Sequence, residues 1–84
     1  MTLQQQIRDF VTSNFYVAEP RTLEDRTSLL DQGIIDSTGV LEVIMFIESK
    51  FGVTVEDSEM LPENLDSIER IAAFVARKQV PIAA

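Results

Sequence analysis

The stretch Asp36–Gly52 has the sequence DSTGVLEVIMFIESKFG, in which apolar residues recur at intervals of three and four. This spacing is typical of one face of an α-helix. Asp36 or Ser37 can accept hydrogen bonds from the free N–H groups of the first turn, and Gly52 is a natural helix stop. The stretch therefore predicts an amphipathic helix whose apolar stripe contains Val40, Val43, Ile44, Ile47 and Phe51.

Two further segments have the same spacing of apolar residues. One covers residues 3–15 and begins after Thr2, and the other covers residues 67–78 and begins after Asp66. Each of these two starting residues is followed three positions later by Gln or Glu, which predicts a capping box. The inward-facing residues are expected to be Leu3, Ile7, Phe10, Val11 and Phe15 in the first segment, and Ile68, Ile71, Ala72 and Val75 in the second.

The connections over 16–35 and 52–65 contain scattered apolar residues, which we expect to pack on the helices. Pro suits the first position of a helix, so 62–65 can form one short turn. No segment has a strand pattern of comparable length. We therefore predict an all-α fold, a small bundle of three or four helices, with one domain over 1–79 and a frayed tail over 80–84.

The composition narrows the possible classes of protein. The chain has 84 residues, the size of one small domain, and 45% of them are hydrophobic. The 14 acidic and 7 basic residues give a net charge of -7, which argues against a nucleic-acid binder because phosphate backbones select for Lys and Arg. The absence of Cys and His excludes a disulfide scaffold, a structural zinc site, a thiol nucleophile and a His-based triad.

Targeting and metal-binding patterns are not seen either. The longest apolar stretch, Val43–Ile47, is far shorter than the ~20 residues that span a bilayer, and the N-terminus has no apolar run of signal-peptide length. The acidic run Glu56–Glu59 lacks the ligand alternation and the glycine of a calcium loop. We therefore expect no membrane span, no metal site, a cytoplasmic location and a monomer.

Ser37 is the candidate site residue, and it has two interpretations. A serine at a helix start is most often only a cap. Its hydroxyl, however, follows a long loop and lies beside the positive end of the helix dipole. A phosphate esterified there would be favoured by roughly 0.3–1 kcal/mol at an exposed position.

Several short motifs follow one another along the chain: Leu29-Leu30-Asp31, Gly33-x-x-Asp36-Ser37 with the helix after it, Phe51-Gly52-Val53, and Pro62-Glu63-Asn64-Leu65-Asp66-Ser67-Ile68. Their order resembles that of acyl and peptidyl carrier proteins. The resemblance extends over nearly the whole chain, together with its length and acidity, and Asp31–Ser37 is similar to stand-alone carriers of amino acids, including D-alanyl carriers. Thr38 departs from the family, which commonly has Leu at this position, and Gly39 is an unfavourable helix residue.

The resemblance implies an acyl-carrier-protein-like bundle in which Ser37 carries 4′-phosphopantetheine, transferred from coenzyme A by a pantetheinyl transferase. The thiol of this arm would hold a cargo as a thioester, so partner enzymes would supply the catalysis and the chain itself would be no enzyme. Further partners would be an acyl- or aminoacyl-loading ligase and a downstream transferase. Asp36, the acidic neighbour in the motif, would either cap the helix and help to engage the transferase, or only cap the helix.

The family also implies a docking surface for partner enzymes on the helix after Ser37. Its acidic groups would steer basic patches of the partners. The alternatives are that the two methionines fill the core and that the glutamates are simply solvated. A different class of function, a small acidic adaptor without a prosthetic group, also stays open, as does the identity of the cargo. The expected docking residues are Leu41, Glu42, Met45, Glu48 and Met60.

Overall fold

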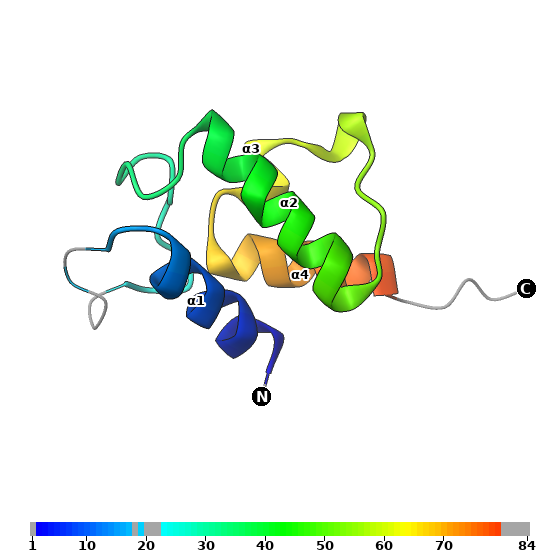
Figure 1. The fold of residues 1–84 in the computed structure, drawn as a ribbon, viewed down its shortest axis with the longest axis horizontal. Coiled ribbons are helices and arrows are strands. Elements are labelled where there is room, and N and C mark those ends of the chain that lie inside the picture. The colour runs from blue at the N-terminus through cyan, green and yellow to red at the C-terminus, as the bar shows by residue number, and fades with distance from the viewer. Residues whose placement is uncertain (1, 18, 20–22, 80–84) are drawn as a thin grey trace, which may run out of the picture.

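The last helix, α4 (Ile68–Gln79), packs against the other three α-helices (Figure 1). The computed structural model describes residues 2–17, 19 and 23–79, so the tail predicted over 80–84 lies outside it. Within these ranges the chain is helical and contains no strand, which confirms the all-α prediction. None of the helices described is both long and apolar enough to cross a membrane. The elements are α1 (Leu3–Asn14), α2 (Ser37–Phe51), a 3-10 turn η2 (Asp57–Glu59), α3 (Pro62–Leu65) and α4 (Ile68–Gln79).

The helix boundaries agree with the predicted ones to within one or two residues, but two of the predicted caps differ. Thr2 Oγ1 accepts a hydrogen bond from Gln5 N at 3.1 Å, while the Gln5 side chain donates to Asp9, so only half of the capping box forms. At the start of α4 the cap is Ser67, whose Oγ accepts from Arg70 N at 3.0 Å. The prediction that Asp66 caps this helix is therefore wrong, and its carboxylate has other partners.

The core receives side chains from every helix and from both connections. All four residues of the predicted apolar stripe of α4 are buried, which confirms that prediction. Phe74, which the prediction did not include, is buried too. In α1, Ile7 and Val11 are buried, whereas Leu3, Phe10 and Phe15 are only partly buried. In α2, the central positions Val43, Ile44 and Ile47 are buried, and Val40 and Phe51 at the ends are partly buried. The connections add Leu23, Leu29, Ile35, Val53 and Val55 to the core, as their apolar character predicts.

The long connection is tied to the helices by hydrogen bonds to its backbone. The guanidinium of Arg8 on α1 donates to the carbonyl of Leu23 and, at 2.6 Å, to Asp25 Oδ1. The backbone N–H of Glu69 in α4 donates to the carbonyl of Asp25 at 2.8 Å. Two helices therefore hold this part of the connection, although it forms no helix of its own.

Gly39 allows the start of α2 to approach the end of α1 closely. A Cβ atom on Gly39 would lie 2.9 Å from Cε1 of Phe15 and 3.1 Å from Cγ2 of Ile35, which is closer than carbon atoms normally pack. Phe15 in turn packs edge-on against Phe10, with ring centroids 5.9 Å apart. The low helix propensity of Gly39 is thus offset by packing that a larger residue would disturb.

The 3-10 turn η2 is held to α4 by an ion pair. Glu59 Oε1 accepts from Lys78 Nζ at 2.8 Å and from the backbone N–H of Glu56 at 3.0 Å. The hydrogen bond from Lys78 is the main cause, and that from Glu56 the second, of the lowering of the Glu59 pKa below its usual 4.5. Glu59 directly precedes Met60, so the ion pair holds the chain to α4 next to Met60.

Replacing Gly39 with Ala is expected to lower the free energy of unfolding by about 1 kcal/mol, because overpacking outweighs the gain in helix propensity. Urea denaturation of G39A and the wild type measures the difference. T38A, at the exposed neighbouring position, is the control and should change stability by less than about 0.5 kcal/mol. A G39A variant more stable than the wild type would show that Phe15 moves aside at no cost.

Replacing Glu59 with Gln is expected to remove a pH-dependent part of the stability. The pKa of Glu59 is lower in the folded state than in the unfolded chain, so its contribution is present above pH 4.5 and is lost as the pH falls through the folded value. Urea denaturation from about pH 7 to pH 3 should show the stability gap between the wild type and E59Q shrinking below pH 4.5. A gap that stays constant over this range would contradict the assignment.

Candidate functional site

Ser37 is the first residue of α2, and its side chain is exposed. The helix is capped by the residue before it: Asp36 Oδ1 accepts from Gly39 N at 2.8 Å. This settles which of the two candidate residues is the cap. The cap-only interpretation of Ser37 is therefore wrong, and among the residues that the structure describes none hydrogen-bonds its hydroxyl.

The segment before Ser37 is a compact turn built around Leu29. Its carbonyl accepts hydrogen bonds from Ile34 N at 2.9 Å and from Ile35 N at 3.2 Å, and its side chain is completely buried. Gly33 allows the reversal, because its φ of 69° lies in the left-handed region that favours glycine. Ile35 is buried, and this anchors the chain just before the cap. Asp36 and Ser37 therefore lie at the surface directly after a segment that is anchored in the core by Leu29 and Ile35.

An apolar groove of about 310 Å³ begins at Ser37. Three segments form it: the turn contributes Leu30, α2 contributes residues of its first turns, and the segment over 60–65, which follows η2 and includes α3, contributes the rest. Sequence reasoning expected Leu30 and Leu61 to pack on the helices, whereas they are 36% and 41% exposed at the rim of this groove. Neither has a periodic pattern around it that could have indicated this. The full lining is Leu30, Ser37, Val40, Leu41, Met60, Leu61, Pro62 and Leu65.

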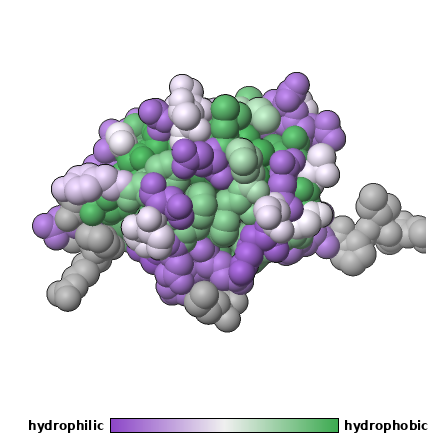
Figure 2. All heavy atoms as spheres, viewed as in Figure 1, coloured by the Kyte–Doolittle hydropathy of each residue, from purple (hydrophilic) through white to green (hydrophobic). Residues whose placement is uncertain are grey.

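The predicted docking residues do not all lie together. Leu41 and Met60 line the groove with Ser37, and Leu41 is 53% exposed. Met45 is 68% exposed, so it does not fill the core. It lies with exposed Glu42 at a second hollow, over the stacked rings of Phe10 and Phe46. Figure 2, viewed from the same side as Figure 1, shows apolar residues gathered across the middle of this face, with hydrophilic residues around them.

Glu48, the remaining predicted docking residue, has a contact inside the fold. Its Oε2 accepts from the backbone N–H of Val55 at 2.9 Å, which ties the connection after α2 back to the helix. The side chain is half-buried rather than freely solvated. Glu48 therefore has a structural role, and its docking role stays a prediction.

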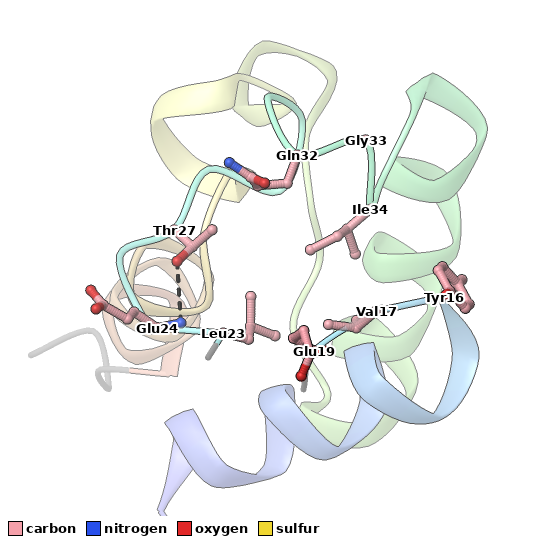
Figure 3. Close-up of a pocket in the computed structure, with 9 residues that line it drawn as sticks. All are labelled: Tyr16, Val17, Glu19, Leu23, Glu24, Thr27, Gln32, Gly33 and Ile34. Atoms are coloured by element: carbon pink, nitrogen blue, oxygen red, sulfur yellow. Dashed lines mark hydrogen bonds between the residues drawn. The ribbon is translucent and has the colours of Figure 1, made fainter. Parts of the chain in front are cut away.

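A further hollow of about 500 Å³ lies along the long connection and does not include Ser37 (Figure 3). Leu23, Val17 and Ile34 contribute apolar side chains to it. The hydrogen bond drawn there, from Glu24 N to Thr27 Oγ1 at 3.1 Å, closes a local turn. The polar side chains around this hollow do not converge on one point, and this distinguishes it from a catalytic site.

Comparison with known proteins identifies the family. The family model described as "Phosphopantetheine attachment site" matches residues 5–75. An acyl carrier protein of Campylobacter hominis is 33% identical over 75 residues, which cover 89% of this chain and 91% of that protein. D-alanyl carrier proteins are similar too: that of Streptococcus suis is 31% identical over 64 residues, covering 70% of this chain and 81% of that protein, and that of Abiotrophia defectiva is 31% identical over 51 residues, covering 61% and 65%.

The site fits the group that this family carries. A phosphodiester on an exposed hydroxyl at the start of α2 would lie beside the positive end of the helix dipole. The apolar groove next to it can shelter an arm that is largely uncharged beyond its phosphate. The match also decides against the adaptor without a prosthetic group. The chain belongs to the phosphopantetheine attachment site family and is a non-catalytic carrier protein whose prosthetic group is 4′-phosphopantetheine, acting with partner enzymes.

Proposed function

We propose that Ser37 is the residue that carries the 4′-phosphopantetheine and that the chain delivers acyl or aminoacyl groups held on it. The observation that supports this most directly is that the helix cap and the exposed hydroxyl at the start of α2 belong to two different residues. Asp36 satisfies the N–H of Gly39, so the hydroxyl of Ser37 is exposed and not needed for capping. A transferase can reach this hydroxyl without breaking a contact within the fold.

The residues around Ser37 would orient the arm rather than react with it. N–H groups in the first turn of α2 that have no intrahelical partner, together with the helix dipole, favour the negative phosphate. The groove wall formed by Val40 and Leu41 keeps apolar surface beside the point of attachment. When bound, the arm supplies a thiol that forms a thioester with the cargo. The chain has no Cys and no His of its own, in keeping with catalysis by its partners.

The partners that we propose are a pantetheinyl transferase, a ligase that loads the cargo, and a transferase that removes it. They would dock on the exposed apolar residues Leu41 and Met45 and on Met60, which also lines the groove. Glu42 is exposed between them, and the net charge of -7 would speed the approach of basic partner surfaces. Asp36 would engage the transferase in addition to capping α2. The cytoplasmic location and the monomeric state stay predictions.

The cargo that we propose is an acyl or aminoacyl group. Relatives named acyl carrier protein and relatives named D-alanyl carrier protein both match the chain. The spacing from Asp31 to Ser37 resembles that of the aminoacyl carriers and favours an aminoacyl cargo. Both kinds of cargo are held by the same thioester chemistry. Mass spectrometry of the protein loaded in its native cell extract would identify the cargo and the modification together.

Incubating the chain with coenzyme A and a broad-specificity pantetheinyl transferase should add about 340 Da, the mass of the transferred arm. S37A should gain nothing, and S49A, at an exposed serine on the same helix, should gain the full adduct. Because Asp36 is the cap, S37A should unfold within about 0.5 kcal/mol of the wild type. An adduct on S37A would rule out Ser37, and unmodified wild type beside a modified control carrier would refute the proposal.

Truncating the exposed apolar residues should weaken docking without unfolding the chain. We expect L41A and M45A each to lower kcat/KM for modification by roughly tenfold, the loss typical of a residue central to an interface. Both side chains are more than half exposed, so thermal unfolding should change little. Y16A is the control, because Tyr16 is 83% exposed and lies outside the groove. If L41A and M45A had the same kcat/KM for modification as the control Y16A, docking would use another surface.

A further inference from the structure

The groove beside Ser37 is assembled from segments that are distant in the sequence, so something must hold its walls together. Leu30 comes from the turn before α2, whereas Leu61 and Leu65 come from α3 and the residue before it. Asp66 directly follows this second wall, at the junction of α3 and α4. Asp66 does not belong to any predicted apolar stripe, and the cap of α4 is Ser67 rather than Asp66.

Both carboxylate oxygens of Asp66 bind the opposite wall. Oδ1 accepts from the backbone N–H of Leu30 at 2.8 Å, and Oδ2 accepts from the hydroxyl of Ser28 at 2.6 Å. The backbone carbonyl of Asp66 also accepts from Leu29 N at 2.7 Å. Hydrogen bonds to an ionised carboxylate are stronger than neutral ones, and Asp66 is half-buried, which reduces competition from water. Three consecutive residues of the turn are therefore tied to one residue of the other wall.

These bonds connect with further hydrogen bonds of the turn, which end at Ile35, two residues before Ser37. Ser28 Oγ, besides donating to Asp66, accepts from Asp31 N at 3.1 Å, so it closes the first half of the turn. The carbonyl of Leu29 then accepts from Ile34 N and Ile35 N, two residues before the start of α2. Asp66 thus controls both the position of Leu30 in the groove and the base from which Ser37 is presented.

We propose that Asp66 is a positioning residue for the loading of Ser37: its carboxylate fixes the Leu30 wall of the groove against the α3 wall, so that a partner enzyme meets a preformed surface around the hydroxyl. This rests on the proposed function, in which Ser37 receives the arm. Asp66 touches neither the hydroxyl nor the groove itself, and it acts through Ser28 and Leu30. Without the carboxylate, the partner would have to order the turn on binding, which costs affinity rather than chemistry.

The test compares D66A, D66N and wild type as substrates for a broad-specificity pantetheinyl transferase with coenzyme A, well below their unfolding temperatures. We expect D66A to raise the KM for the carrier by about fivefold to tenfold with kcat within about twofold. D66N should stay within about threefold of wild type, because its amide oxygen can still accept from Leu30 N while its NH₂ donates to Ser28 Oγ. S28A, which removes one of the two carboxylate bonds, should fall between D66A and wild type and serves if D66A does not fold.

A second readout separates positioning from general loss of stability. In D66A the amides of Leu30, Ile34 and Ile35 should exchange with solvent about tenfold faster or more, while those of α4 stay protected. The control is R8A, which loosens the same connection at Leu23 and Asp25 and leaves the groove contacts intact. R8A should lose thermal stability without a rise in KM.

Each outcome decides between the two proposals. Wild type that is not modified at Ser37 overturns the proposed function, and with it this inference. Wild type that is modified, together with an unchanged KM for D66A or an equal rise in R8A, overturns the role of Asp66 alone. The same holds if D66N is as impaired as D66A, because the hydrogen-bond geometry would then not be what matters.

Discussion

The hydrogen bond from Gly39 N to the carboxylate of Asp36, 2.8 Å long, is the contact on which the site depends. A helix must satisfy the free N–H groups of its first turn, and either a carboxylate or a hydroxyl at the N-cap can accept a hydrogen bond from one of them. Here the carboxylate takes that role, and the serine beside it is released. The same turn is fixed from the other side, since Gly39 lets Phe15 and Ile35 approach closely. Asp36, the N-cap of α2, is thus held in place while the next residue, Ser37, remains open to an enzyme.

This arrangement fits a protein that carries a reactive group without reacting itself. The chain has neither thiol nor imidazole. Apart from Tyr16, the exposed large apolar side chains of the described residues lie on α2 or at the groove beside Ser37. A rigid base, a free hydroxyl and an apolar rim are what a carrier needs when several enzymes must bind the same small surface in turn. The acidic surface adds attraction at a distance, which salt will weaken.

Most of the fold could be predicted from the sequence, because the helices have periodic stripes and strong end signals. Gly52 ends α2 with a φ of 69°, as its position suggests, and Pro62 opens α3. What the pattern could not show depends on contacts between distant segments. Asp66 has the spacing of a helix cap, but the turn at Ser28–Leu30 competes for its carboxylate and Ser67 takes the cap instead. Likewise Leu30 and Leu61 have no periodic neighbours, so their place at the groove appears only when three segments meet.

The most direct test of the central claim is fragmentation mass spectrometry of the protein isolated from its own cells. Cleavage after Arg26 and Lys50 gives one peptide with serines at 28, 37 and 49, so fragment ions can place the arm on a single hydroxyl. Our account predicts that the phosphodiester lies on Ser37 and that Ser28 and Ser49 are unmodified. An arm on either of those two serines, or a bare Ser37 in protein that carries the arm elsewhere, would contradict it.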